Sequence, residues 1–133
     1  MPQAGDTYEV ALKQSHLNWG TYRNPTNRNP IKGEAYIPIP KDFADNHGVY
    51  NSNHTPTGYG YNQFHAKSKD GFLHDVTLLA QGSSSAGAVY AKQFSVQDNL
   101  KEIGDWYRHC KASVGDKVKV EWVSTTSVVL EII

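Results

Sequence analysis

Residues 36–48 read YIPIPKDFADNHG, and this stretch decides the expected fold. Residues 34–40 are of extended type, and the two prolines among them limit ladder pairing, which predicts an edge strand or a strand end. Directly after Pro40, residues 41–47 are expected to form a short helix that Gly48 ends. The sequence thus predicts an edge strand that leads into a short helix.

A second informative stretch, residues 104–120, reads GDWYRHCKASVGDKVKV. Within residues 99–111 the apolar side chains recur at helical spacing, which predicts a second short helix. Residues 117–122 then alternate between polar and apolar side chains, as a half-buried strand does. Six side chains of this region are expected in the core: Trp106, Tyr107, Val114, Val118, Val120 and Trp122.

The remaining signals are mostly strand signals. Asp70-Gly71 favours a hairpin turn between two strands. Together with residues 34–40 and 117–122, strands are expected at residues 7–12, 62–66, 74–79, 88–94 and 127–133. About seven strands and two short helices in 133 residues predict one all-β domain, a sandwich or barrel with helical plugs.

Composition excludes several classes of protein. Thirteen basic residues balance thirteen acidic ones, which argues against a polybasic, non-specific nucleic-acid or membrane binder. No apolar run approaches the ~18 residues of a spanning helix, and the first residues do not resemble a signal peptide. Cys110 stands alone, which excludes an internal disulfide framework and a multi-cysteine zinc site. We therefore expect an intracellular protein.

The neutral total hides an uneven distribution of charge. Residues 13–33 contain four basic residues and no acidic one. In residues 76–97 the only charged side chain is that of Lys92. Although the chain as a whole is neutral, residues 13–33 therefore form a basic segment and residues 76–97 form a second segment without acidic residues.

These residues resemble a known family. Residues 36–48 are similar to the "IP..FA..HG" segment of B3 DNA-binding domains, and residues 104–120 to their "GW..F.....L..GD.V.F" segment. The two segments occur in the right order, about 55 residues apart. Leu17-Asn18-Trp19-Gly20, followed by residues 34–40, looks more like the bacterial branch, whose B3-like domains are recognition modules of restriction endonucleases, including the phospholipase-D-type enzymes. The resemblance covers most of the chain.

The resemblance implies a seven-stranded open pseudobarrel with two short helices, which agrees with the independent count above. It also implies two arms that enter one major groove of double-stranded DNA: an N-arm at residues 18–32 and a C-arm at about residues 81–92. These are the two segments without acids. The resemblance therefore predicts a non-catalytic recognition domain of a restriction-modification enzyme in the bacterial cytoplasm, with no cofactor and with any nuclease activity in another domain or subunit.

Arginine pairs with the guanine O6/N7 edge, and asparagine or glutamine with the adenine N6/N7 edge, so the arms carry suitable chemistry. The predicted N-arm contacts are Asn18, Trp19, Tyr22, Arg23, Asn24, Asn27, Arg28, Asn29 and Lys32, although Trp19 also suits a core position. The predicted C-arm contacts are Gln81, Ser83, Ser84, Ser85, Tyr90 and Lys92. His65 and Lys67 are further candidates for phosphate contacts, and no metal site is expected.

Two other functions stay open. Trp19, Tyr22, Tyr59 and Tyr61 suit a carbohydrate-binding or small-molecule-binding β domain that stacks rings on its ligand. A small hydrolase would instead use His47 and His54 with Asp45. His65-Ala66-Lys67 begins the phospholipase-D motif, but Phe72 stands where that motif needs aspartate, so no catalytic pair is predicted. Cys110 is expected as a buried thiol.

Overall fold

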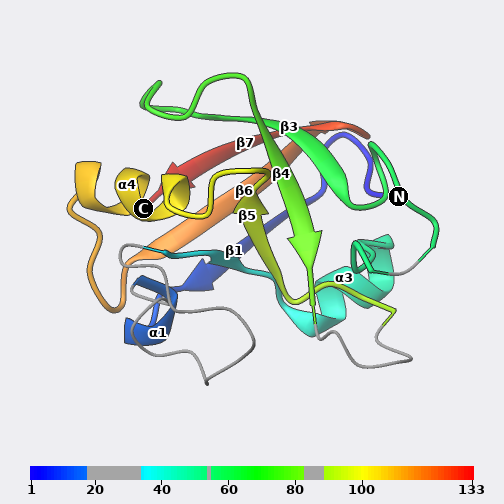
Figure 1. Ribbon diagram of the computed structural model, residues 1–133, viewed down its shortest axis with the longest axis horizontal. Coiled ribbons are helices and arrows are strands. Elements are labelled where there is room, and N and C mark those ends of the chain that lie inside the picture. The colour runs from blue at the N-terminus through cyan, green and yellow to red at the C-terminus, as the bar shows by residue number, and fades with distance from the viewer. Residues whose placement is uncertain (18–33, 54, 83–88) are drawn as a thin grey trace.

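The computed structural model describes residues 1–17, 34–53, 55–82 and 89–133. Within these ranges, seven strands form a single sheet, with three short helices around it (Figure 1). The strands are β1 (Thr7–Ala11), β2 (Ile37–Pro38), β3 (Gln63–Ser68), β4 (Val76–Gln81), β5 (Gln93–Val96), β6 (Lys117–Ser124) and β7 (Ser127–Ile132). The helices are α1 (Gln14–Leu17), α3 (Lys41–His47) and α4 (Glu102–His109).

The sheet is an open pseudobarrel. Its strand order is β1-β6-β7-β3-β4-β5-β2, and every neighbouring pair is antiparallel except β3 with β7. The edge strands β1 and β2 share no ladder, but the Tyr8 hydroxyl of β1 donates a 2.9 Å hydrogen bond to the Pro38 carbonyl of β2. The expected all-β class and the seven strands are confirmed, and β2 with its proline is an edge strand as predicted.

The inside of the pseudobarrel is aromatic. Trp122 of β6 is fully buried and packs against rings from four other elements. Its ring centroid lies 5.1 Å from that of Phe43 on α3, 5.5 Å from Phe64 on β3, 6.2 Å from Tyr8 on β1 and 6.3 Å from Phe94 on β5. Because the Phe43 side chain enters this core, helix α3 packs against the sheet as expected of a helical plug.

Helix α3 agrees with its prediction at both ends. It begins at Lys41 after Pro40 and ends at His47, and Gly48 follows in the left-handed conformation with φ of 72°. A side chain at Gly48 would be strained in that conformation, which explains why a glycine ends the helix.

Three expectations are wrong in detail. Two helices were expected, yet α1 is a third, and its single turn is too short to show a helical period. The strand expected at 88–94 begins only at Gln93, because Tyr90 makes no more than an isolated bridge to Tyr50. Val114 is 59% exposed, since it lies in the tight turn in which the Ser113 N–H bonds the Asp116 carboxylate.

Within the described ranges, no helix is long and apolar enough to cross a membrane.

Candidate nucleic-acid interface

Most of the predicted arm residues lie outside the described residues. All nine N-arm candidates and Ser83, Ser84 and Ser85 of the C-arm belong to this group. The structure does describe Gln81, Tyr90 and Lys92, and it describes the chain on both sides of each arm. The candidate interface is therefore built from the stems that hold the two arms.

The N-arm stem consists of residues 13–17 before the arm and residues 34–36 after it. The Tyr36 N–H lies 3.4 Å from the His16 carbonyl, and the two rings meet edge to face at 5.4 Å. The buried Tyr107 of α4 donates a 2.8 Å hydrogen bond from its hydroxyl to the Tyr36 carbonyl. The two ends of the arm are thus held together and attached to α4.

His16 fixes the turn that leads into the N-arm. Its Nδ1 accepts the Lys13 N–H at 3.0 Å, which requires an unprotonated Nδ1. Partial burial, and then the nearby Lys13 ammonium, lower the pKa of His16. The neutral imidazole is therefore the form that holds α1 in place.

The C-arm stem consists of residues 80–82 before the arm and residues 89–92 after it. The Lys92 N–H donates a 2.7 Å bond to the Gln81 carbonyl. The Gln81 side-chain oxygen accepts the Ser95 hydroxyl at 2.9 Å, which leaves its amide NH₂ as the group able to donate to a base. Tyr90 is 38% exposed and stacks on Tyr50 at 5.6 Å.

A third segment, residues 49–52, completes the C-arm stem. The buried Asn51 donates its N–H to the Val89 carbonyl at 2.9 Å, and the Ser52 N–H donates to the Ala80 carbonyl at 3.0 Å. Gly82 lies so close to this segment that a Cβ there would be 3.2 Å from Asn51 Nδ2 and 3.0 Å from the Tyr90 carbonyl oxygen. The C-arm stem therefore consists of three segments, of which residues 49–52 come from a distant part of the sequence.

The two stems lie side by side. Strand β2 follows the N-arm stem and pairs with β5, which follows the C-arm stem, in the register Ile37 with Phe94 and Pro38 with Gln93. The Ile39 N–H donates a 2.8 Å bond to the Lys92 carbonyl. In Figure 1, α1, α3 and the end of β4 all lie in the lower half of the view. The fold thus joins two segments that are about 50 residues apart in the sequence.

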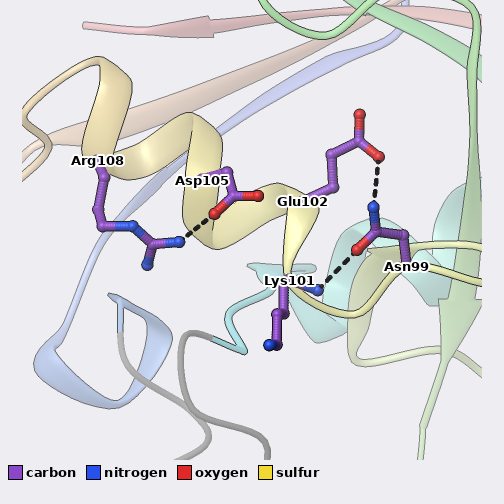
Figure 2. A network of polar contacts seen from close by, with 5 residues as sticks. All are labelled: Asn99, Lys101, Glu102, Asp105 and Arg108. Atoms are coloured by element: carbon purple, nitrogen blue, oxygen red, sulfur yellow. Dashed lines mark hydrogen bonds and ion pairs between the residues drawn. The ribbon is translucent and has the colours of Figure 1, made fainter.

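The acids of α4 beside the N-arm stem are engaged in local contacts. The Arg108 guanidinium bonds the Asp105 carboxylate one turn away, and Glu102 accepts the Asn99 side-chain amide at 3.1 Å (Figure 2). The Asn99 side-chain oxygen also accepts the Lys101 N–H at 3.2 Å. Figure 2 shows the Lys101 side chain pointing away from both carboxylates. Of these two carboxylates, that of Asp105 is therefore paired in charge with Arg108, whereas that of Glu102 contacts a neutral amide.

His65 and Lys67 are exposed on β3, but the structure does not bring them to the stems. His65 is paired with Thr77, four residues before Gln81 on β4, which is roughly 13 Å at about 3.3 Å per residue. Both side chains instead line a hollow of about 520 Å³ with Asp75, Val123 and Ser127. A phosphate contact by these two residues remains a prediction, at a different place on the surface.

The described rings of the carbohydrate alternative lie apart, and His47 of the hydrolase alternative is bound to a carboxylate other than Asp45. Tyr59 stacks on His65 at 4.3 Å, whereas Tyr61 lies 6.2 Å from Tyr50, so the described rings of the carbohydrate hypothesis have different neighbours. His47 binds the Asp6 carboxylate at 3.1 Å instead of Asp45. The described side chains contain no group of three or more His, Cys, Asp or Glu placed to hold a metal ion, and His54, Trp19 and Tyr22 lie outside them.

Sequence reasoning missed the role of Asp70. Its carboxylate accepts the Trp106 Nε1–H at 3.0 Å, the Cys110 thiol at 2.9 Å, the Phe72 N–H at 3.0 Å and the Ser68 hydroxyl. Burial raises the pKa of Asp70, but these hydrogen bonds outweigh it and hold the pKa well below its usual range. The Asp-Gly pair signalled only a turn, whereas the side chain attaches that turn to α4.

Cys110 is half-buried, not buried as expected. Desolvation, together with the hydrogen bond to Asp70 and its charge, raises the pKa of the Cys110 thiol to about 12. The thiol is therefore protonated at neutral pH and acts as a donor, which is unsuitable for a nucleophile.

The chain matches no protein-family model and no curated protein. Among solved structures it is similar to the N-terminal domain of Helicobacter pylori LlaJI.R1, with 10% identity and a TM-score of 0.53 over 96% of this chain and 87% of that one. It is also similar to the chain of an Arabidopsis FUS3–DNA complex, with 17% identity and a TM-score of 0.49 over 94% and 93% of the two chains. The first similarity covers nearly the whole chain, and the shared fold agrees with the B3-like fold expected from the sequence.

Proposed function

We propose that this chain, which has the B3-like fold, binds double-stranded DNA sequence-specifically by inserting its N-arm and C-arm into one major groove. The observation that carries the proposal is the pairing of β2 with β5, which holds the two arm stems side by side. Two arms that start from neighbouring stems can reach adjacent base pairs of one groove, which is about 12 Å wide in B-form DNA.

Charge supports the same function. The two arms are the segments without acidic side chains, and they carry guanidinium, amide and hydroxyl groups suited to base edges and phosphates. Four of the thirteen basic residues lie in the arms, so the rest of the domain has nine basic and thirteen acidic residues, a net charge of −4, which limits non-specific binding along DNA. A local basic surface on an acidic body favours discrimination between sequences over uniform attraction.

The resemblance of residues 17–20, followed by residues 34–40, to the bacterial branch points to a finer role. We infer a target-recognition domain of a restriction endonuclease, with DNA cleavage in another domain or subunit. The protonated Cys110 thiol, a poor nucleophile, and the engagement of His47 with Asp6 support a non-catalytic module.

The test is selection of bound duplexes from a random pool, followed by titration of the selected duplex at several salt concentrations. We expect one consensus sequence and an affinity that falls steeply with salt. Arg23→Ala or Arg28→Ala should cost about 1–3 kcal/mol and relax the preference at one base pair. Arg108→Ala is the matched control, since its guanidinium is already bound to Asp105. Enrichment of no sequence at low salt would contradict the proposal, and glycan binding by the same protein would favour the carbohydrate alternative.

A further inference from the structure

A groove lies between α3 and the C-arm stem, and its wall includes Tyr90 and Lys92 of the C-arm. Its volume is about 320 Å³. Ile39 and Ala91 are buried and form apolar parts of its surface. The polar side chains that line it are those of Lys41, Asp45, Tyr90 and Lys92.

The groove is held by the same bonds that join the stems. The Ile39 N–H donates to the Lys92 carbonyl at 2.8 Å, and the Ala91 N–H donates to the Val49 carbonyl at 3.0 Å. Tyr90 is stacked on Tyr50. The positions of the lining residues are therefore set by backbone pairing, which makes the groove part of the folded scaffold.

Lys41 and Lys92 are both exposed, and neither ammonium is in an ion pair with a described residue. Asp45 lies one helical turn after Lys41 on α3, at the spacing of a helical ion pair, yet no such pair forms. Two lysines and one aspartate line the groove, so its lining has a net positive charge. The Tyr90 hydroxyl adds a neutral donor.

We propose that this groove holds the sugar–phosphate backbone of the bound duplex beside the C-arm, with Lys41 and Lys92 on the phosphate. The proposal rests on the proposed function and adds Lys41 of α3, which belongs to neither arm, to the DNA surface. Two lysines and a hydroxyl suit a phosphodiester anion, and the apolar parts formed by Ile39 and Ala91 suit the deoxyribose. Because phosphates carry no sequence information, this contact adds affinity and fixes the register of the arms.

Asp45 gives the proposal a sharp signature. Its carboxylate repels a phosphate in the groove, so Asp45→Asn should tighten binding of the selected duplex, whereas Lys41→Ala should weaken it. We expect Lys41→Ala to lower the affinity about three- to tenfold near 0.1 M salt and to reduce the slope of log affinity against log salt by about 1. Neither change should alter the selected consensus.

Asp42→Asn is the matched control, because Asp42 is an exposed carboxylate on the same helix that does not line the groove. The experiment titrates the wild-type chain and the three variants with the selected duplex. Each titration is run without inorganic phosphate and with it at about ten times the concentration of duplex phosphates, at constant ionic strength. Opposite shifts for Lys41→Ala and Asp45→Asn, with no effect of inorganic phosphate or of Asp42→Asn, support a backbone contact. Equal affinities and salt slopes for all variants of a chain that binds DNA overturn the groove proposal and leave the proposed function standing. Competition by inorganic phosphate overturns it in favour of a free-anion site, and a wild-type chain that binds no duplex overturns the proposed function itself.

Discussion

Asp70→Asn replaces one oxygen of the side chain that attaches the β3–β4 turn to α4. In the wild-type protein one carboxylate oxygen accepts the Ser68 hydroxyl and the Phe72 N–H, and the other accepts the Trp106 indole and the Cys110 thiol. An asparagine side chain offers a single acceptor oxygen and an NH₂ donor. One of the two pairs of donors therefore loses its acceptor in the variant.

The magnitude depends on the burial of Trp106. Its side chain is fully buried, so the indole N–H cannot turn to water when its acceptor is replaced by NH₂. A buried donor left without a partner costs about 1–3 kcal/mol. At ~4 °C per kcal/mol for a domain of this size, we expect the melting temperature to fall by roughly 4–12 °C.

The assay is urea unfolding followed by far-UV circular dichroism between pH 2.5 and 7. The pKa of Asp70 in the folded protein lies well below the value of about 3.9 of an unfolded aspartate. Its carboxylate therefore stabilises the fold fully above about pH 4 and progressively less as the pH falls toward the folded-state pKa. The difference in unfolding free energy between wild type and Asp70→Asn should be largest near neutral pH and shrink in acid.

Asp75→Asn is the control, because Asp75 is an exposed carboxylate whose one described ion pair, with His74, lies on the surface. Such a pair contributes about 0–1 kcal/mol. If Asp70→Asn is no less stable than Asp75→Asn at pH 7, or if its deficit is the same at pH 3, Asp70 does not attach the turn to α4 as described.

Three further changes test other parts of the structure. Tyr8→Phe removes the 2.9 Å hydrogen bond to the Pro38 carbonyl that connects the two edge strands, and it should lower the unfolding free energy by about 0.5–1.5 kcal/mol in urea titrations. An unchanged urea midpoint would contradict a stabilising role for this bond. Cys110, with its pKa of about 12, should react slowly with iodoacetamide at pH 8, and Asp70→Asn should speed this reaction about tenfold or more. Equal rates in the wild type and the variant would show that the Asp70 carboxylate does not hold the thiol protonated. Gly82→Ala crowds the C-arm stem and should weaken binding of the selected duplex while the circular dichroism spectrum stays that of wild type; full affinity would show that the arm tolerates the shift.

Local patterns in the sequence determined much of the fold. The prolines of 36–40 predicted an edge strand because they cannot complete a ladder, and β2 is one. The helix of residues 41–47 ends at Gly48 because that position needs a left-handed backbone, which glycine adopts without strain. The acid-free segments and their side chains were also visible in the sequence, since charge and hydrogen-bonding groups belong to residue types.

Only the tertiary structure decided which other parts of the molecule lie next to those segments. Pairing of β2 with β5 brings the arm stems together, and residues 49–52 complete the C-arm stem through backbone hydrogen bonds. Asp70 reaches Trp106 across 36 residues, and Lys41 and Lys92 line one groove although they are far apart in the sequence. Periodicity and turn chemistry act over a few residues, whereas these contacts depend on which strands pair, and strand pairing is settled only when the whole sheet buries its aromatic core.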